Sequence, residues 1–423
     1  MDFLDGSYLT VVTLAGAVAR SVARGLPANW RLRLAAGVPE DLAAGWLWVH
    51  AVSVGELLLA EGLLGRLRER GHAIHVTTGT ATGLELLRQR LPGWDQGTGR
   101  ITGGAFPLDD PEGLRPFFRT PPAAFIALET ELWPNLLREL EARAIPRVIV
   151  NGRLTQRSLG RGGAWLARAA SRLTLVAARD EDSVAAFRSL GAPRVELGGN
   201  LKADLPPPRP LHAGWTLLRE AWAAYPVLVA GNTVEGEEEL ILAAWAAARH
   251  HRPGLRLMLA PRQPRRFAAV ARLLEDQGLA FRQASDPWPP TADAWAGTEL
   301  LLLDTLGELA AAYGEATLAL VGGGWAWHGG HNPLEPVRWG VPTLLGPGFA
   351  NFADLVRPLQ AAGLVQVVEK DKLATTLATI LAAAPLRPTE STKAVPYPES
   401  LTGALGKTCD FLNILLPAPR YLH

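Results

Sequence analysis

The sequence predicts an α/β protein in which two doubly wound parallel-sheet domains face a central cleft. Short apolar runs alternate with longer amphipathic stretches, as buried parallel strands alternate with helices in this fold class. The alternation stops at the proline-rich segment LPPPRPLH, residues 205–212, and then starts again. The length of 423 residues leaves room for roughly two or three domains that each bury a core.

We expect five segments along the chain. They are an N-terminal helical segment at 1–40, a first domain at 41–205, a linker at 206–212, a second domain at 213–390 and a C-terminal tail at 391–423. In doubly wound folds, ligands bind beyond the carboxyl ends of the strands. The expected site is therefore the cleft between the two domains.

The predicted strands are short runs rich in valine, isoleucine and leucine, with helical patterns between them. In the first domain they cover residues 46–52, 73–78, 123–128, 147–152, 174–178 and 194–199. In the second domain they cover residues 227–231, 255–260, 299–304, 316–323, 341–346 and 364–368. One helix of the second domain has charges that complement its dipole, with Glu235, Glu237, Glu238 and Glu239 at its start and Arg249, His250 and His251 at its end.

The N-terminal segment contains an uncharged, mostly apolar stretch at residues 8–19, followed by several arginines. Twelve helical residues rise about 18 Å, which is less than the hydrocarbon core of a bilayer. Asp2 and Asp5 are also unlike the basic start of a signal peptide. Two interpretations stay open: a helix that packs on the protein, or one that lies in a membrane interface with its arginines toward anionic headgroups.

The charge balance excludes a general nucleic-acid binder, because the net charge is only +1 and no basic field surrounds the chain. Any anionic partner must therefore be held by a local site. Lysine is rare, with five residues in all, and Lys202 is the only one in the first 369 positions. The single cysteine, Cys409, has no partner for an internal disulfide or a thiolate metal site, so we expect a reducing compartment.

Carboxylates follow two predicted strands of the first domain. Glu56 lies in HAVSVGE, residues 50–56, where it can act as a general base or, with Ser53, form a helix capping box. Glu129 and Glu131 lie in ALETELWPN, residues 127–135, where mutual repulsion would raise one pKa. The alternative is that they serve the dipole of the following helix.

Basic and glycine-rich motifs complete the candidate site. Lys202 lies in GNLKAD, and Arg262 lies in APRQPRRF, where it can clamp a phosphate while Arg265 and Arg266 are predicted to be solvated. Gly322, Gly323 and Gly324 follow a strand, and their backbone N–H groups are predicted to approach an anion. Asn332 is a predicted helix N-cap with Pro333 at the first helical position, and Glu335 is placed for sugar hydroxyls. Neither GxxxxGK[ST] nor GxGxxG occurs, so kinase and dehydrogenase chemistry has no support.

These motifs, in this order, resemble the 3-deoxy-D-manno-oct-2-ulosonic acid (Kdo) transferases of lipopolysaccharide synthesis. The resemblance rests on HAVSVGE, TTGTATG, ETELWPN, NGRLTQRS, GNLKAD, EGEEE, PRQPRRF and GGHNPLEPVRWGVPTLLGPGFANF, and covers about residues 45–360. It implies a glycosyltransferase B fold, with an acceptor-binding first domain and a nucleotide-sugar-binding second domain. It also implies an inverting transfer of Kdo from CMP-Kdo to a lipid A precursor without a cofactor or a catalytic metal. Attachment to the cytoplasmic face of the inner membrane is implied as well.

The resemblance also implies roles for individual residues. Glu56 matches the proposed general base, and Glu129 or Glu131 and Lys202 match positions that line the cleft. The region that holds CMP is matched by Arg262, Gly323, Gly324, Asn332 and Glu335. Two positions depart from the family pattern, because Val234 and Gln263 stand where histidine is usual. These departures concern the donor domain and leave the reaction class in place.

Two rival functions are considered. A UDP-sugar transferase or epimerase of the same fold would bind UDP rather than CMP. A noncatalytic, membrane-associated sugar-nucleotide-binding protein would not depend on Glu56 for any cellular phenotype. No nucleic-acid partner is expected in either case.

Overall fold

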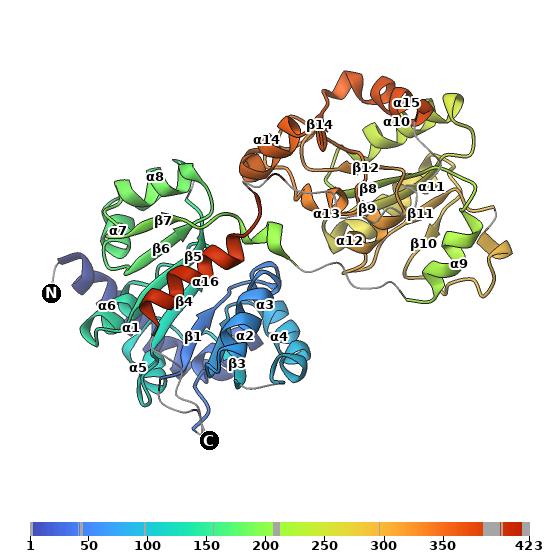
Figure 1. Ribbon diagram of the computed structural model, residues 1–423. Helices are drawn as coiled ribbons and strands as arrows, with labels where there is room; N and C mark the ends of the chain where they lie inside the picture. The colour runs from blue at the N-terminus through green and yellow to red at the C-terminus, as the bar shows by residue number, and fades with distance from the viewer. Residues whose placement is uncertain are drawn as a thin grey trace. The chain divides into compact units, whose positions relative to one another are not determined.

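The computed structural model describes residues 3–40, 42, 45–96, 99–154, 156–205, 212–295, 297–383, 398 and 401–416. The chain forms two compact units (Figure 1). The first comprises Met1–Pro206 together with Leu401–His423, and the second comprises Pro207–Ser400. Each unit is described separately below.

The first unit is built on a seven-stranded sheet in the order β3-β2-β1-β4-β5-β6-β7, with every neighbouring pair parallel. The strands are β1 (Leu47–His50), β2 (Ile74–Thr78), β3 (Ile101–Ala105), β4 (Ala124–Leu128), β5 (Arg147–Gly152), β6 (Leu175–Ala178) and β7 (Val195–Leu197). The helices are α1 (Phe3–Ser21), α2 (Ala28–Leu34), α3 (Val54–Glu69), α4 (Ala81–Trp94), α5 (Pro111–Leu114), α6 (Pro134–Ala142), α7 (Gln156–Ala170), α8 (Glu181–Ser189) and α16 (Ala404–Leu415).

Both faces of this sheet are buried, because alternate strand residues point to opposite sides. On one face, Leu47, Val49 and their neighbours pack against α3, α4 and α16. On the other face, Trp46 and Trp48 pack against residues of α5, α6, α7 and α8. This two-sided burial explains why the strands are apolar throughout rather than alternating with polar residues.

The second unit repeats the same architecture, with a parallel sheet in the order β10-β11-β9-β8-β12-β13-β14. The strands are β8 (Val227–Thr233), β9 (Arg256–Pro261), β10 (Arg282–Gln283), β11 (Leu300–Leu302), β12 (Leu318–Val321), β13 (Thr343–Leu345) and β14 (Val365–Val367). The helices are α9 (Gly214–Ala221), α10 (Glu238–His251), α11 (Phe267–Asp276), α12 (Leu309–Ala312), α13 (Leu334–Val337), α14 (Ala353–Ala361) and α15 (Leu373–Ala383). Residues of α10, α11 and α15 pack on one face of the sheet, and Trp215, Trp222, Trp295 and Tyr313 pack on the other.

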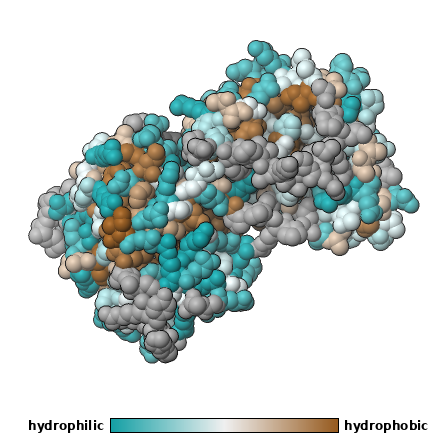
Figure 2. Space-filling view, viewed as in Figure 1, coloured by the Kyte–Doolittle hydropathy of each residue, from teal (hydrophilic) through white to brown (hydrophobic). Residues whose placement is uncertain are grey.

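The two parallel-sheet α/β domains are thus confirmed, and the central cleft stays a prediction. On the face shown in Figure 2, hydrophobic residues form separate clusters among hydrophilic ones. In the interior, the four buried clusters of the two sheets account for much of the 48% of residues that are hydrophobic. In the part of the chain that the structure describes, no helix combines the length and hydropathy that crossing a membrane requires.

The last described segment, α16, belongs to the first unit although it follows the second unit in the sequence (Figure 1). Its Ala404, Cys409 and Leu412 are buried in the core with α3. Asp204 accepts hydrogen bonds from the N–H groups of Gly403 (3.2 Å) and Leu405 (2.7 Å), which joins the start of α16 to the end of the first unit's main segment. The expected linker at 206–212 lies outside the described residues except for His212.

Candidate active site

In the first unit, the predicted site residues follow the carboxyl ends of strands of one parallel sheet. Glu56 comes after β1, and Glu129 and Glu131 come after β4, the direct neighbour of β1. Lys202 lies on a short 3-10 helix, Leu201–Asp204, after β7. Because the carboxyl ends of parallel strands share one edge of the sheet, the fold gathers these charges on the same edge.

Glu56 forms the capping interaction that its spacing from Ser53 predicts. The Ser53 hydroxyl accepts a hydrogen bond from the Glu56 N–H (3.4 Å), while Glu56 Oε2 accepts one from the Val52 N–H (2.7 Å). Ser53 also donates its hydroxyl to Glu56 Oε1 (3.1 Å). Burial raises the pKa of Glu56, and the Val52 N–H and the nearby Lys202 partly oppose this rise. A capped carboxylate with a raised pKa is a suitable proton acceptor, so the cap and the general base are compatible roles.

Lys202 pairs with Glu129, with 3.6 Å between Nζ and Oε1. Glu129 has a positive φ of 58°, which is unusual for a residue other than glycine and is found preferentially at functional sites. The isolated lysine therefore lies beside a carboxylate on a strained turn after β4. The prediction that Lys202 contacts an ion is consistent with this arrangement and stays a prediction.

Asn151 is a residue that the sequence analysis missed. It has a positive φ of 53° where the pairing of β5 with β6 shifts register. Its buried Oδ1 accepts a hydrogen bond from the Leu201 N–H (3.0 Å), and so positions the segment that carries Lys202. The only sequence signal was the tolerance of asparagine for left-handed backbone, which is too general to identify one residue.

His50 and Glu131 also lie near each other at this edge of the sheet. His50 is fully buried, and its Nδ1 lies 3.0 Å from the Thr77 carbonyl oxygen. Because a carbonyl only accepts, this contact is a hydrogen bond when Nδ1 carries the proton, and the Thr77 hydroxyl lies 3.1 Å from the same nitrogen. Nε2 lies 3.9 Å from Glu131 Oε2. Burial lowers the pKa of His50 to about 3, so the ring is neutral.

The surroundings of Glu131 also shift its pKa. Burial, followed by the carboxylates of Glu56 and Glu129, raises the pKa of Glu131 to about 7, although Arg33 acts in the opposite direction. Glu131 can therefore exchange its proton near neutral pH, the range in which acid/base chemistry operates.

The raised pKa of Glu131 predicts that its contribution to the stability of the protein depends on pH. The folded state keeps the Glu131 proton up to about pH 7, whereas an unfolded glutamate releases it near 4.5. The stability of the protein relative to its Glu131→Gln variant should therefore fall by about 1–3 kcal/mol as the pH rises from 4.5 to 7. Urea unfolding at several pH values measures the difference, with Glu85→Gln as a control for replacing an exposed carboxylate. A difference that stays constant with pH would contradict the assignment.

In the second unit, the predicted donor residues also follow strand carboxyl ends. Arg262 comes directly after β9, and the glycines 322–324 come directly after β12. These strands flank β8 on either side. Arg262 lies close enough to His331 to lower its pKa, together with the larger effect of burial, to about 4. No hydrogen bond or ion pair to the Arg262 guanidinium occurs among the described residues, and this side chain is exposed.

The glycine loop differs from the prediction in one respect. The N–H of Gly323 donates to Oε2 of Glu237 (2.7 Å), and the N–H of Gly322 donates to the Gly231 carbonyl of β8 (2.9 Å). The anion that the Gly323 N–H approaches is thus a carboxylate of the protein itself. The expected use of the Gly323 N–H for a ligand is corrected, because Glu237 already accepts its hydrogen bond.

Three smaller expectations also need correction. Helix α13 begins at Leu334 with Pro333 as its N-cap, although the Asn332 side chain does accept a hydrogen bond from the Leu334 N–H (3.2 Å). Arg266 is not solvated, since it pairs with the buried Glu238 (3.0 Å). Glu237 and Glu238 are fully buried, so they are more than dipole partners of α10.

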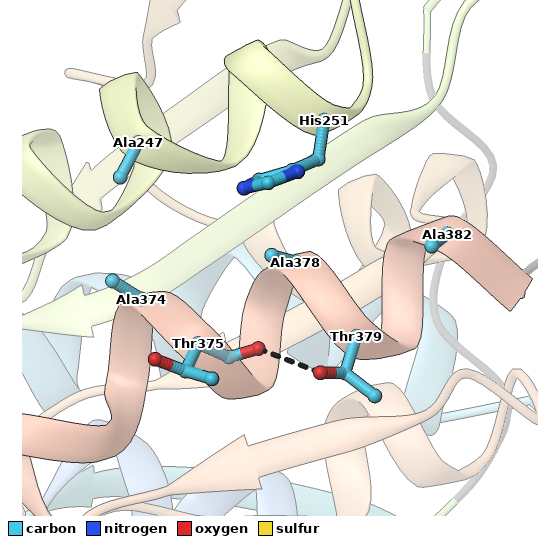
Figure 3. Close-up of a pocket in the computed structure, with 7 residues that line it drawn as sticks. All are labelled: Ala247, His251, Ala374, Thr375, Ala378, Thr379 and Ala382. Atoms are coloured by element: carbon cyan, nitrogen blue, oxygen red, sulfur yellow. Dashed lines mark hydrogen bonds between the residues drawn. The ribbon is translucent and has the colours of Figure 1, made fainter.

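A cavity of about 420 Å³ elsewhere in the second unit is not part of this site (Figure 3). Ala247 and His251 of α10 line it on one side, and small residues of α15 line it on the other: Ala374, Thr375, Ala378, Thr379 and Ala382. The Thr379 hydroxyl is already used, because it donates to the Thr375 carbonyl (2.9 Å). The predicted site residues are absent from its lining.

Two doubly wound parallel-sheet units with charged residues after their strands form the glycosyltransferase B fold. A solved structure of UDP-GlcNAc 2-epimerase from Neisseria meningitidis matches with a TM-score of 0.57 at 14% identity, covering 88% of this chain and 100% of that one. At that identity the likeness concerns the fold alone.

The comparisons with known sequences identify the family. The model of the 3-deoxy-D-manno-octulosonic-acid transferases (kdotransferases) matches residues 28–205. The 3-deoxy-D-manno-octulosonic acid transferase of Haemophilus influenzae is 36% identical over 76% of this chain and 75% of its own. That of Bordetella pertussis is 34% identical over 90% of both chains. The chain belongs to the 3-deoxy-D-manno-octulosonic acid transferase family, which confirms the resemblance found in the motifs.

Proposed function

We propose that this protein transfers Kdo from CMP-Kdo to a lipid A precursor, with inversion at the anomeric carbon. The observation that carries the proposal is the cluster of Glu56, Glu129, Glu131 and Lys202 at the carboxyl edge of the first sheet, in a chain of the Kdo transferase family. The first unit is the proposed acceptor domain. The second unit is the proposed donor domain.

In the proposed reaction, Glu56 removes the proton of an acceptor hydroxyl as that oxygen attacks the anomeric carbon of Kdo. The new glycosidic bond forms as the bond from that carbon to the CMP phosphate oxygen breaks. The electron pair leaves with CMP, and the proton stays on Glu56. Arg262 is the proposed partner of the phosphate, because its guanidinium is exposed and suited to bidentate contact. Gly324, Asn332 and Glu335 are proposed to surround the rest of the nucleotide. Gly323 is proposed to line it without donating its N–H, because that group donates to Glu237.

A direct assay tests the proposal. Purified protein is incubated with CMP-Kdo and a tetraacylated lipid A precursor, and the product is weighed by mass spectrometry. We expect the acceptor mass to increase by whole Kdo residues, and the number of increments gives the number of sugars added. Thermal stabilisation by UDP but not by CMP would favour the rival UDP-sugar enzyme.

We further propose that α1 lies in the surface of the inner membrane on its cytoplasmic side. One side of α1 is fastened to the first unit, by the Tyr8 hydroxyl donating to Asp109 (3.0 Å) and by Arg20 pairing with Asp110 (2.6 Å). The opposite side exposes Val11 (64%), Leu14 (63%) and Val18 (63%), which share one helix face. The exposed Arg24 and Arg31 follow this face and suit anionic headgroups. In this proposal, one side of α1 packs on the protein and the other side lies in the membrane interface, so the two interpretations of residues 8–19 apply to opposite sides of one helix.

The membrane proposal predicts a loss of vesicle binding. The triple variant Val11→Ser, Leu14→Ser, Val18→Ser removes the exposed apolar face, so its partition coefficient onto vesicles with 30% anionic lipid should fall at least about tenfold. Cosedimentation measures the partition. Leu306→Ser is the matched control, because Leu306 is also exposed (75%) but lies in the second unit. Equal binding by the triple variant and the native protein would contradict the proposal.

A further inference from the structure

A fully buried carboxylate organises the glycine loop of the second unit. Glu237 immediately precedes α10, and none of its surface is exposed. Its Oε2 accepts hydrogen bonds from the N–H groups of Gly323 (2.7 Å) and Val234 (3.2 Å). Its Oε1 accepts from the N–H groups of Trp325 (2.8 Å) and Ala326 (3.2 Å). One side chain therefore fixes three backbone donors of the loop after β12 and one of the turn after β8.

The loop is shaped to admit this carboxylate. A Cβ atom on Gly322 would lie 2.7 Å from Glu237 Oε2, and one on Gly323 would lie 2.6 Å from the His331 ring. Gly323 also has a φ of +83°, which disfavours any side chain. Positions 322 and 323 must therefore be glycine for the loop to close around Glu237 and for His331 to lie beside the loop.

The loop and the carboxylate depend on each other energetically. A buried carboxylate without donors is strongly unfavourable, and buried N–H groups without an acceptor are unfavourable as well. Four donors to one charged group satisfy both requirements in a single loop conformation. The neighbouring Glu238 has a similar role. It accepts hydrogen bonds from the Thr233 hydroxyl (3.0 Å) and from Arg266 (3.0 Å), and Arg266 lies in the loop that carries Arg262.

We propose that Glu237 is a positioning residue that sets the conformation of the donor-binding loop and thereby the affinity for the nucleotide sugar. The inference rests on the proposed function, in which Gly323, Gly324, Asn332 and Glu335 surround CMP. Glu237 itself is buried beneath the loop and acts on the ligand through the loop backbone. The EGEEE motif thus supplies consecutive buried acids, one for the glycine loop and one for the loop after β9.

The test is the Glu237→Gln variant. Its amide keeps the size of the side chain but has a single acceptor oxygen, so two of the four N–H groups lose their partner. We expect KM for CMP-Kdo to rise about tenfold to a hundredfold, with KM for the lipid acceptor unchanged. Amide hydrogen exchange at residues 323, 325 and 326 should accelerate at least about tenfold, while strands β8 and β9 keep their protection.

Glu239→Gln is the matched control. Glu239 lies two residues after Glu237, in the first turn of α10, but its side chain is exposed. It should change neither the donor KM nor the exchange rates. Hydrogen exchange needs no turnover, so it separates this inference from the proposed function. If native protein fails to use CMP-Kdo but the Glu237→Gln loop still exchanges faster, the function is wrong and the loop role stands. Unchanged exchange and an unchanged donor KM would overturn the inference. Should Glu237→Gln fail to fold, Glu237→Asp, whose shorter side chain reaches fewer donors, replaces it in both measurements, with the same criteria.

Discussion

Glu56→Gln should abolish Kdo transfer, lowering kcat by about 10²–10⁴-fold while leaving CMP binding nearly unchanged. Glutamine can still accept the hydrogen bond from the Val52 N–H, so the start of α3 should survive. It cannot take a proton from the acceptor hydroxyl at neutral pH. Transfer rates with CMP-Kdo and calorimetric titration with CMP measure the two quantities on the same protein.

Ser53→Ala is the matched control for the capping role of this segment. It removes the hydroxyl that caps α3 but leaves the carboxylate of Glu56 in place. We expect it to cost about 1 kcal/mol of stability and to change the transfer rate only a few-fold. If Ser53→Ala loses as much activity as Glu56→Gln, or if Glu56→Gln loses CMP binding equally, Glu56 is a structural cap rather than the base.

Asp109→Ala should have the largest effect on stability, about 3 kcal/mol. Asp109 is buried, and its carboxylate accepts hydrogen bonds from the N–H groups of Asn135 (3.1 Å) and Leu136 (2.8 Å) at the start of α6. It also accepts from the Tyr8 hydroxyl, which fastens α1. The alanine variant leaves all three donors without this partner. Urea unfolding measures the loss.

Glu112→Ala is the control for Asp109→Ala. The Glu112 side chain is 61% exposed and pairs with Arg20 at 3.2 Å on the surface, where ion pairs contribute little. It should change the free energy of unfolding by about 0.5 kcal/mol or less. Comparable losses for the two variants would mean that Asp109 does not anchor α1 and α6.

The strands that the sequence predicts contain apolar runs, and the two strands that it does not predict lack them. All twelve predicted strands occur, because two-sided burial produces apolar runs that are visible in the sequence. β3 and β10 each lie at one edge of a sheet, and the predicted strands β7 and β14 lie at the opposite edges. β3 has the sequence ITGGA and β10 has only two residues, so neither carries an apolar run. Edge strands need less burial, so hydrophobicity does not reveal those that, like β3 and β10, lack an apolar run.

Within the candidate site, the sequence indicates the residues that are proposed to contact a ligand better than the residues that position them. Glu56, Lys202 and Arg262 stand out by type and by their place after a strand. Glu237 and Asp109 do not, because an acidic residue before a helix looks the same whether it faces solvent or accepts four backbone hydrogen bonds. Only the tertiary structure brings the loop after β12 to the start of α10, so no local pattern encodes that contact.

The position of α16 has a consequence for the order in which the protein folds during synthesis. The first unit begins to leave the ribosome early, yet Ala404, Cys409 and Leu412 complete its core from the far end of the chain. Until then, the apolar side of α3 that α16 covers has no partner, and such surface favours aggregation or chaperone binding. The second unit lies within one continuous segment and does not wait for α16. The unit synthesised first is therefore the last to be completed.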